Sequence, residues 1–126
     1  MAKTWTVLVA DDDPAVRQLS RATLERLGLI VVEAADGEQA IDAFRRCQAD
    51  LVVLDAKMPR LDGFAVCRKI RKLDYGCDVP VIMVTALADS DSAKRARAAE
   101  ATEFVTKPVN WGWLAERIQG FLKPPA

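Results

Sequence analysis

The sequence predicts an α/β fold in which strands and helices alternate along one domain and the strands form a parallel sheet. Three observations lead to this prediction. Short runs of β-branched and aliphatic residues recur, and segments with helical spacing lie between them. Such alternation is typical of a sheet with helices packed on both faces. The chain has 126 residues, of which 51% are hydrophobic, and this is enough for one packed core region.

The first strand is predicted at 6–10, a run of strand-favouring residues that ends at three consecutive aspartates. Pro14 follows, and proline is favoured at the first helical position, where an N–H group has no partner within the helix. Gly28 is well placed to end this helix, which is therefore predicted over about 14–27. The residues that recur at steps of three and four along it are Val16, Leu19, Thr23 and Leu27.

The second strand is predicted at 30–34. A turn at Asp36-Gly37 opens the second helix, which runs to about Cys47. The third strand, 51–54, is apolar at every position, as expected for a strand buried on both faces of a parallel sheet. Asp55 then stands at the carboxyl end of this strand, where open α/β sheets place their sites.

Asp62 is predicted to cap the third helix, because an aspartate side chain can accept hydrogen bonds from the first helical turn. A loop at 74–78 leads to the fourth strand, 80–85, in which proline is tolerated only at the start. The alanine-rich, charged segment 90–99 has a narrow apolar face. We therefore expect it to form the least firmly docked helix.

The last strand is predicted at 104–106, and Asn110 is predicted to cap the last helix, which reaches about 122. Five strand–helix units with right-handed crossovers give a doubly wound (βα)5 fold. We expect the flavodoxin-like strand order 2-1-3-4-5. In this order the topological switch lies between the first and third strands, which places the aspartates 11–13 beside Asp55.

Composition narrows the functional classes. The 18 basic and 18 acidic residues balance, which gives no sign of a surface for nucleic acid or for a membrane. No apolar run approaches the ~20 residues of a membrane span, and the N-terminus has no secretory pattern, so we expect a cytoplasmic protein. The three cysteines are odd in number and lack Cys-x-x-Cys spacing, which argues against a disulfide framework. The sequence contains no histidine, which argues against a Cys/His zinc site.

Polar residues stand at the carboxyl ends of four predicted strands: Asp11 to Asp13, Asp55, Thr85 and Lys107. Taken singly, each has a simpler explanation. Asp12 or Asp13 can cap the first helix, Thr85 suits a strand and lysine is usually exposed. Together, at one edge of the sheet near the switch point, they are better explained as a site.

The carboxylates of this site would repel one another without a cation. A hard divalent cation, Mg²⁺ or Mn²⁺, takes oxygen ligands and leaves positions for water and phosphate. Lys107 and Thr85 would then face phosphoryl oxygens, and Asp55, which lies centrally, is the expected nucleophile.

Four motifs resemble those of the receiver domains of two-component response regulators, in the CheY-like superfamily. The resemblance covers nearly the whole chain, with a receiver domain at 1–122 and with 123–126 as a C-terminal tail or the start of a linker. The motifs are Asp11-Asp12-Asp13-Pro14, the run from Leu54-Asp55 to Asp62-Gly63, Val84-Thr85-Ala86 and Thr106-Lys107-Pro108.

The resemblance implies that Asp55 accepts a phosphoryl group from a sensor histidine kinase or a phosphotransfer protein. It also implies that Asp12 binds the metal directly, that Asp11 binds it through water, and that the backbone carbonyl of Lys57 is a further ligand. Thr85 and Lys107 would bind the phosphoryl group, and Lys107-Pro108 would be a cis peptide. Thr85 and Phe104 would be the residues that move on activation.

The same resemblance implies that the surface of helix 4, strand 5 and helix 5 signals to a downstream effector protein or domain. It also allows a phosphorylation-dependent homodimer, and it limits catalysis to the protein's own phosphorylation and dephosphorylation. The basic run Lys94, Arg95 and Arg97 is either a solvated helix face or part of that partner surface. Of Trp111 and Trp113, we expect one to pack and one to be exposed as an interface anchor.

Three residues depart from the family pattern: Lys57, Leu87 and Glu100. Lys57 and Leu87 occupy positions that tune dephosphorylation in the family. The ammonium of Lys57 can approach the phosphoryl group, and an apolar Leu87 cannot orient water, which favours slow hydrolysis. Glu100 replaces a glycine, so a left-handed backbone there would be strained by ~1 kcal/mol or more.

Other functions remain open. The chain can be a free-standing receiver or the receiver of a larger regulator, such as a cyclic-di-GMP enzyme, which the stretch 107–111 resembles. An aspartyl-phosphate phosphatase of the dehalogenase type needs a second aspartate where Lys57 stands. A nucleotide-binding domain would need a glycine-rich loop after the first strand, which the sequence lacks.

Overall fold

In the computed structural model, which describes residues 4–86 and 90–122, parallel strands form a five-stranded sheet in the order β2-β1-β3-β4-β5. This order confirms the doubly wound topology predicted from the sequence. The strands are β1 (Thr6–Ala10), β2 (Ile30–Ala34), β3 (Leu51–Asp55), β4 (Val81–Thr85) and β5 (Glu103–Thr106).

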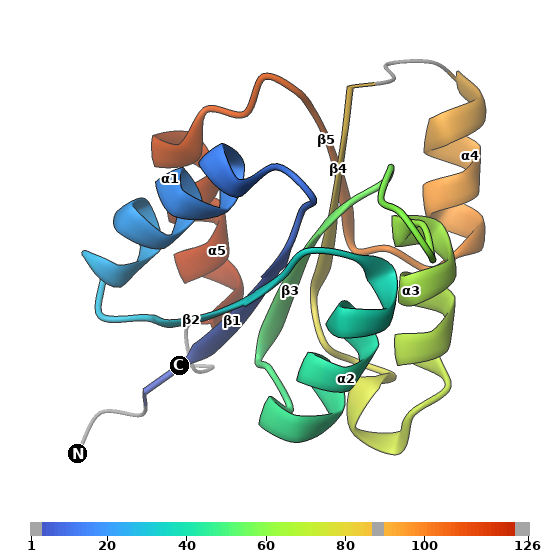
Figure 1. Cartoon of the computed structure of the whole chain (residues 1–126), viewed down its shortest axis with the longest axis horizontal. Coiled ribbons are helices and arrows are strands. Elements are labelled where there is room, and N and C mark those ends of the chain that lie inside the picture. The colour runs from blue at the N-terminus through green and yellow to red at the C-terminus, as the bar shows by residue number, and fades with distance from the viewer. Residues whose placement is uncertain (1–3, 87–89, 123–126) are drawn as a thin grey trace.

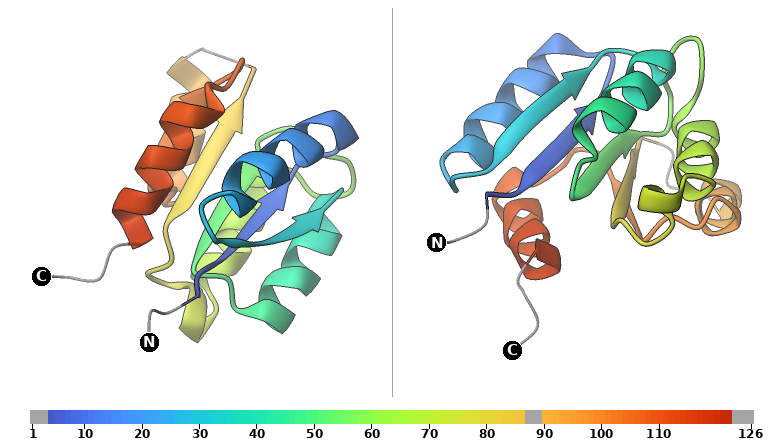
Figure 2. Two further views of the ribbon diagram at one scale, coloured as in Figure 1. Left: turned by 90° about the vertical axis from the view of Figure 1, so that its left-hand side faces the viewer. Right: turned by 90° about the horizontal axis from the view of Figure 1, so that it is seen from below.

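Helices cover both faces of the sheet (Figure 1). They are α1 (Pro14–Glu25), α2 (Gly37–Cys47), α3 (Gly63–Arg71), α4 (Ser90–Ala98) and α5 (Trp111–Leu122), with a short 3-10 turn η1 (Asp74–Gly76). One face carries α1 and α5, and the other carries α2, α3 and α4, an arrangement that the two turned views of Figure 2 also show. Within the described ranges, no helix is long and apolar enough to cross a membrane.

The sheet separates two hydrophobic cores. One lies between the sheet and α1 and α5, and includes Leu24, Leu114 and Ile118. The other lies under α2, α3 and α4, and includes Phe44 and Ile70. All positions of β3 and β4 are buried because both faces of these strands are covered. The predicted fully buried strand at 51–54 is confirmed.

Helix α1 differs from its prediction. It ends at Glu25, and Leu19 and Leu27 are 53% and 39% exposed rather than packed inward. The buried positions of the helix are Ser20 and Leu24. Ser20 can face the core because its hydroxyl donates to the carbonyl of Arg17 at 2.9 Å, which satisfies its polar group. Gly28 has a φ of +80°, as expected for the glycine that ends this segment.

The segment between β5 and α5 agrees with the prediction. Lys107-Pro108 is a cis peptide. The Asn110 side chain accepts a hydrogen bond from the Trp113 amide at 3.0 Å, so it caps α5 as predicted. Trp111 is buried whereas Trp113 is 46% exposed, which confirms that one tryptophan packs and the other does not.

Glu100 lies between α4 and β5 and has a φ of 63°, so the left-handed backbone that would strain a glutamate is present. We expect Glu100→Gly to raise the melting temperature by about 3 °C, because glycine removes a backbone penalty of about 1 kcal/mol. Arg71 Nε donates to the Glu100 carbonyl at 2.9 Å, and this backbone contact would survive the substitution. Thermal unfolding followed by circular dichroism measures the effect.

Glu100→Ala is the matched control. Alanine removes the same side chain but keeps the β-carbon that makes this conformation costly. The alanine variant should therefore melt close to the wild type. Equal gains in the glycine and alanine variants would assign the effect to the lost charge rather than to the backbone.

Candidate functional site

The register of the sheet brings four strand ends together. Ala10 of β1 pairs with Leu54 of β3, and Asp55 of β3 pairs with Val84 of β4. Thr85 of β4 pairs with Thr106 of β5. The residues that follow or end these strands therefore meet at one edge of the sheet, as predicted for the switch point between β1 and β3.

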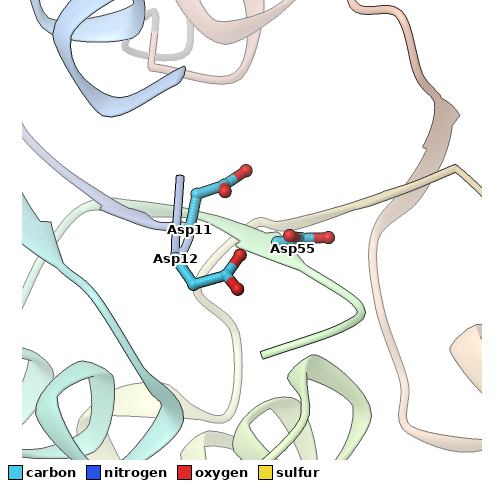
Figure 3. Close-up of side chains that lie close together, drawn as sticks. All are labelled: Asp11, Asp12 and Asp55. Carbon is cyan, nitrogen blue, oxygen red and sulfur yellow. The ribbon is translucent and has the colours of Figure 1, made fainter. Parts of the chain in front are cut away.

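Three carboxylates form the centre of this edge. The ligand atoms of Asp11, Asp12 and Asp55 all lie within 4.8 Å of one another. Figure 3 shows Asp11 and Asp12 approaching from the loop after β1, and Asp55 approaching from the end of β3. Asp11 and Asp55 are buried, whereas Asp12 is exposed.

The cap of α1 is Asp13 and not Asp12. The Asp13 side chain accepts a hydrogen bond from the Ala15 amide at 2.9 Å. The amide of Asp13 in turn donates to Asp11 Oδ1 at 2.9 Å, which orients that carboxylate. The capping role proposed for one of two aspartates thus falls to Asp13, and the cap does not engage the Asp12 carboxylate.

Lys107 places its ammonium between two of the carboxylates. Its Nζ atom lies 3.2 Å from Asp11 Oδ2 and 3.3 Å from Asp55 Oδ2. Burial lowers the pKa of the Lys107 ammonium, but attraction to Asp55 and Asp11 outweighs burial, so the pKa lies above its ordinary value. Lys107 is therefore a fixed positive charge in the site.

Burial raises the pKa of the Asp55 carboxyl, and repulsion from Asp11 raises it further. Lys107 and the Lys57 amide lower that pKa but do not cancel the increase. The Lys57 amide donates to Asp55 Oδ1 at 3.3 Å. Among the described residues, the three carboxylates of the site face the single ammonium of Lys107, so the negative charge of these side chains exceeds the positive charge beside them.

This donor set fits a hard divalent cation. It consists of carboxylate oxygens, which Mg²⁺ and Mn²⁺ prefer, and it carries an excess of negative charge that such a cation would neutralise. The residues that would hold the ion are Asp11, Asp12 and Asp55. The role of the Lys57 carbonyl stays a prediction.

Thr85 ends β4 and is 1% exposed, and its carbonyl accepts a hydrogen bond from the Lys107 amide at 2.8 Å. This hydrogen bond joins the ends of β4 and β5 beside Asp55. Phe104 of β5 is partly buried and packs against the core under α2, α3 and α4. Leu87, the second predicted tuning residue, lies outside the described residues.

Helix α4 docks through small side chains and one arginine. Ser92 and Ala96 of the helix are buried, and so is Ala99, which directly follows it. Arg95 lies 4.2 Å from the centroid of the Phe64 ring and pairs with Asp62 at 3.4 Å. Arg95 therefore contacts α3 rather than only solvent, which the sequence alone did not indicate.

Two supporting residues have no role in the sequence-based predictions, although Gly63 belongs to one of the motifs. Gly63 begins α3, and a β-carbon there would lie 2.3 Å from the carbonyl oxygen of Asp55. Arg17 of α1 donates from Nη1 to the Asp11 carbonyl at 2.7 Å. A signal for Arg17 exists, because helical side chains point back toward the N-terminus and Arg17 lies one turn after the aspartates.

Comparison with known proteins agrees with this geometry. The family described as "Response regulator receiver domain" matches residues 7–119. The chain is 39% identical over 117 residues to "Probable transcriptional regulator ycf27" of Porphyridium aerugineum, covering 93% of the chain and 48% of that protein. It is 38% identical over 123 residues to "Transcriptional regulatory protein CseB" of Streptomyces avermitilis, covering 98% of the chain and 51% of that protein.

Solved structures of response regulators have the same fold as this chain. The chemotaxis response regulator CheY4 of Vibrio cholerae superposes with a TM-score of 0.89 at 28% identity, covering 95% of the chain and 100% of that structure. The chain spans about half the length of the curated relatives that it matches, and all of the CheY4 structure.

Proposed function

Because the chain belongs to the family of response regulator receiver domains, we propose that it is a phosphorylation-dependent switch with Asp55 as the acceptor. The observation that carries the proposal is the position of Asp55, between two further carboxylates and the Lys107 ammonium at the end of a buried strand. A carboxylate held in this way can act as a nucleophile toward phosphorus.

In the proposed step, one Asp55 carboxylate oxygen bonds to phosphorus. The bond from phosphorus to a ring nitrogen of the donor histidine breaks, and its electron pair stays on that nitrogen, where a proton neutralises it. Lys107, already within 3.3 Å of Asp55, holds the negative phosphoryl oxygens in place. The hydroxyl of Thr85, at the adjacent strand end, is proposed to donate a hydrogen bond to the same group.

Mg²⁺ or Mn²⁺ bound by Asp11, Asp12 and Asp55 would neutralise the charge that accumulates on the transferring group. The Lys57 carbonyl is proposed as a further ligand. Both oxygens of the Asp11 carboxylate have partners: Oδ1 accepts a hydrogen bond from the Asp13 amide, and Oδ2 accepts one from Lys107.

The proposed output is a change in the surface formed by α4, β5 and α5. Thr85 and Phe104 would move together, because Thr85 ends β4 and Phe104 pairs with Met83 of the same strand. The phosphodonor would be a histidine kinase or a phosphotransfer protein, and the receiver of the signal an effector protein or domain. Relatives named as transcriptional regulators favour a transcriptional effector over a cyclic-di-GMP enzyme.

The test is uptake of phosphate from a small phosphodonor. We expect the protein to gain one phosphoryl group in the presence of Mg²⁺, as measured by intact mass, and to gain none when a chelator removes the ion. Peptide mapping after borohydride reduction should place the group on Asp55. Uptake that persists with the chelator, or that maps to another residue, would disprove the proposal.

Lys57 is predicted to prolong the phosphorylated state. Its amide contacts the Asp55 carboxylate, so its side chain starts beside the acceptor. An ammonium there can hold phosphoryl oxygens, whereas asparagine can orient an attacking water. We expect Lys57→Asn to lose phosphate about fivefold faster, which corresponds to a barrier change of about 1 kcal/mol.

Loss of phosphate after removal of the donor, followed by intact mass, measures this rate. Lys57→Arg is the matched control, because it keeps the positive charge and should retain a lifetime close to that of the wild type. Identical rates for the asparagine variant and the wild type would exclude a role of Lys57 in phosphoryl lifetime.

A further inference from the structure

Behind the carboxylate cluster, a second set of charged residues lies on the α1 side of the sheet. Arg17 donates from Nε to Glu33 Oε1 at 3.1 Å and from Nη1 to the Asp11 carbonyl at 2.7 Å. Its side chain is only 18% exposed. One guanidinium thus connects the edge strand β2, which carries Glu33, with the loop that follows β1.

The contact with the Asp11 carbonyl fixes a peptide that matters to the site. A peptide unit is planar, so holding the Asp11 carbonyl also sets the direction of the Asp12 backbone. The Asp11 amide is held as well, since it donates to the Ala34 carbonyl at 3.1 Å. The Asp12 side chain is exposed, but the backbone directly before it is fixed by these two hydrogen bonds of Asp11.

We infer that Arg17 is a positioning residue for the divalent cation, because it holds the Asp11–Asp12 peptide in the orientation that directs Asp12 toward Asp55. Glu33 balances the guanidinium charge, so Arg17 orders the loop with little repulsion of a cation. This inference rests on the proposed function, and it adds to it a residue that touches neither the phosphoryl group nor the cation.

Arg21 provides a matched control. It also pairs with Glu33, at 2.5 Å, and with Glu25 at 3.2 Å, both on the same side of the sheet. Within residues 4–86 and 90–122, its described ion pairs do not reach the loop after β1. Arg17→Ala and Arg21→Ala therefore both remove a Glu33 partner, but only Arg17→Ala removes the contact with Asp11.

The experiment is a calorimetric titration of the full chain with Mg²⁺, together with phosphodonor rates measured across Mg²⁺ concentrations. We expect Arg17→Ala to weaken Mg²⁺ binding by about tenfold, the usual effect of losing a residue that orients metal ligands. Arg21→Ala should bind Mg²⁺ as the wild type does. At saturating Mg²⁺, the phosphorylation rate of Arg17→Ala should return to the wild-type value, which a general loss of structure would not allow.

Arg17→Lys serves if the alanine variant does not fold. One ammonium cannot serve both Glu33 and the Asp11 carbonyl as a guanidinium does, so binding should again weaken several-fold. Wild-type affinity in a folded Arg17 variant, or an equal loss in Arg21→Ala, overturns the inference and leaves the proposed function intact. A wild-type protein that binds no Mg²⁺ overturns the proposed metal site and the role of Arg17 together.

Discussion

Asp55→Asn is expected to take up no phosphoryl group under conditions in which the wild type is fully modified. Asparagine keeps the shape of the side chain, but its neutral amide is not a nucleophile toward phosphorus. The neighbouring carboxylates of Asp11 and Asp12 remain, so the variant also asks whether either can substitute. Intact mass after treatment with a phosphodonor and Mg²⁺ gives the answer.

The same substitution should stabilise the metal-free protein. The pKa of the Asp55 carboxyl is raised by burial and by Asp11, so the folded protein binds this proton more tightly than the unfolded chain does. Protonation therefore favours folding, and the ionised carboxylate destabilises the fold at neutral pH. Asp55→Asn should melt higher than the wild type at neutral pH, and the difference should shrink as the pH falls through the raised pKa.

Asp13→Asn is the matched control for both measurements. Its side chain caps α1, and asparagine caps helices about as well as aspartate. This variant should accept phosphate as the wild type does and should lack the metal-free gain in stability. Phosphate uptake by Asp55→Asn, or loss of uptake in Asp13→Asn, would mean that the acceptor has been misassigned.

Gly63→Ala is expected to lower the free energy of unfolding by about 3 kcal/mol. A β-carbon at this position would lie 2.3 Å from the Asp55 carbonyl oxygen and 3.0 Å from the Ala56 Cα atom, both part of the backbone. Neither can move without displacing the end of β3. Urea unfolding measures the loss, and slower phosphate uptake should accompany it because Asp55 shifts.

Gly120→Ala makes the same change in α5, where no heavy atom beyond the adjacent residues and the nearby backbone of the helix itself lies within 4 Å of the new β-carbon. Alanine favours a helix over glycine by about 1 kcal/mol, so this variant should be more stable. Opposite signs for two glycine-to-alanine changes in helices would identify steric contact as the cause. Equal stability of Gly63→Ala and the wild type would mean that α3 can move away from β3 at little cost.

The sheet could be predicted because its signal is local. Apolar runs ending in polar residues identify the strands, and the rule for parallel crossovers supplies the order. The orientation of α1 was less predictable. Its apolar spacing pointed to Leu19, but the buried positions are Ser20 and Leu24. Ser20 can be buried because its hydroxyl forms a hydrogen bond within the helix. The spacing of hydrophobic residues contains no information about that hydrogen bond.

The candidate site could likewise be predicted only in part. Asp11, Asp12, Asp55 and Lys107 could be predicted to lie together because each ends or follows a strand. Which of Asp12 and Asp13 caps α1 could not be predicted, because either residue suits a helix cap. Gly63 and Arg17 act through contacts with the backbone of Asp55 and Asp11, and such contacts depend on how segments pack rather than on residue type.

The complete burial of β3 has a consequence for amide hydrogen exchange. Its amides lie in the middle of the sheet under helices on both faces, so their exchange with solvent should require unfolding of the whole domain. Helix α4, which is held by the buried Ser92 and Ala96 and by the Arg95 contacts, should exchange through much smaller openings. The proposed phosphate acceptor would thus stand on the slowest-exchanging strand, while the surface proposed to respond would open and close many times before that strand does.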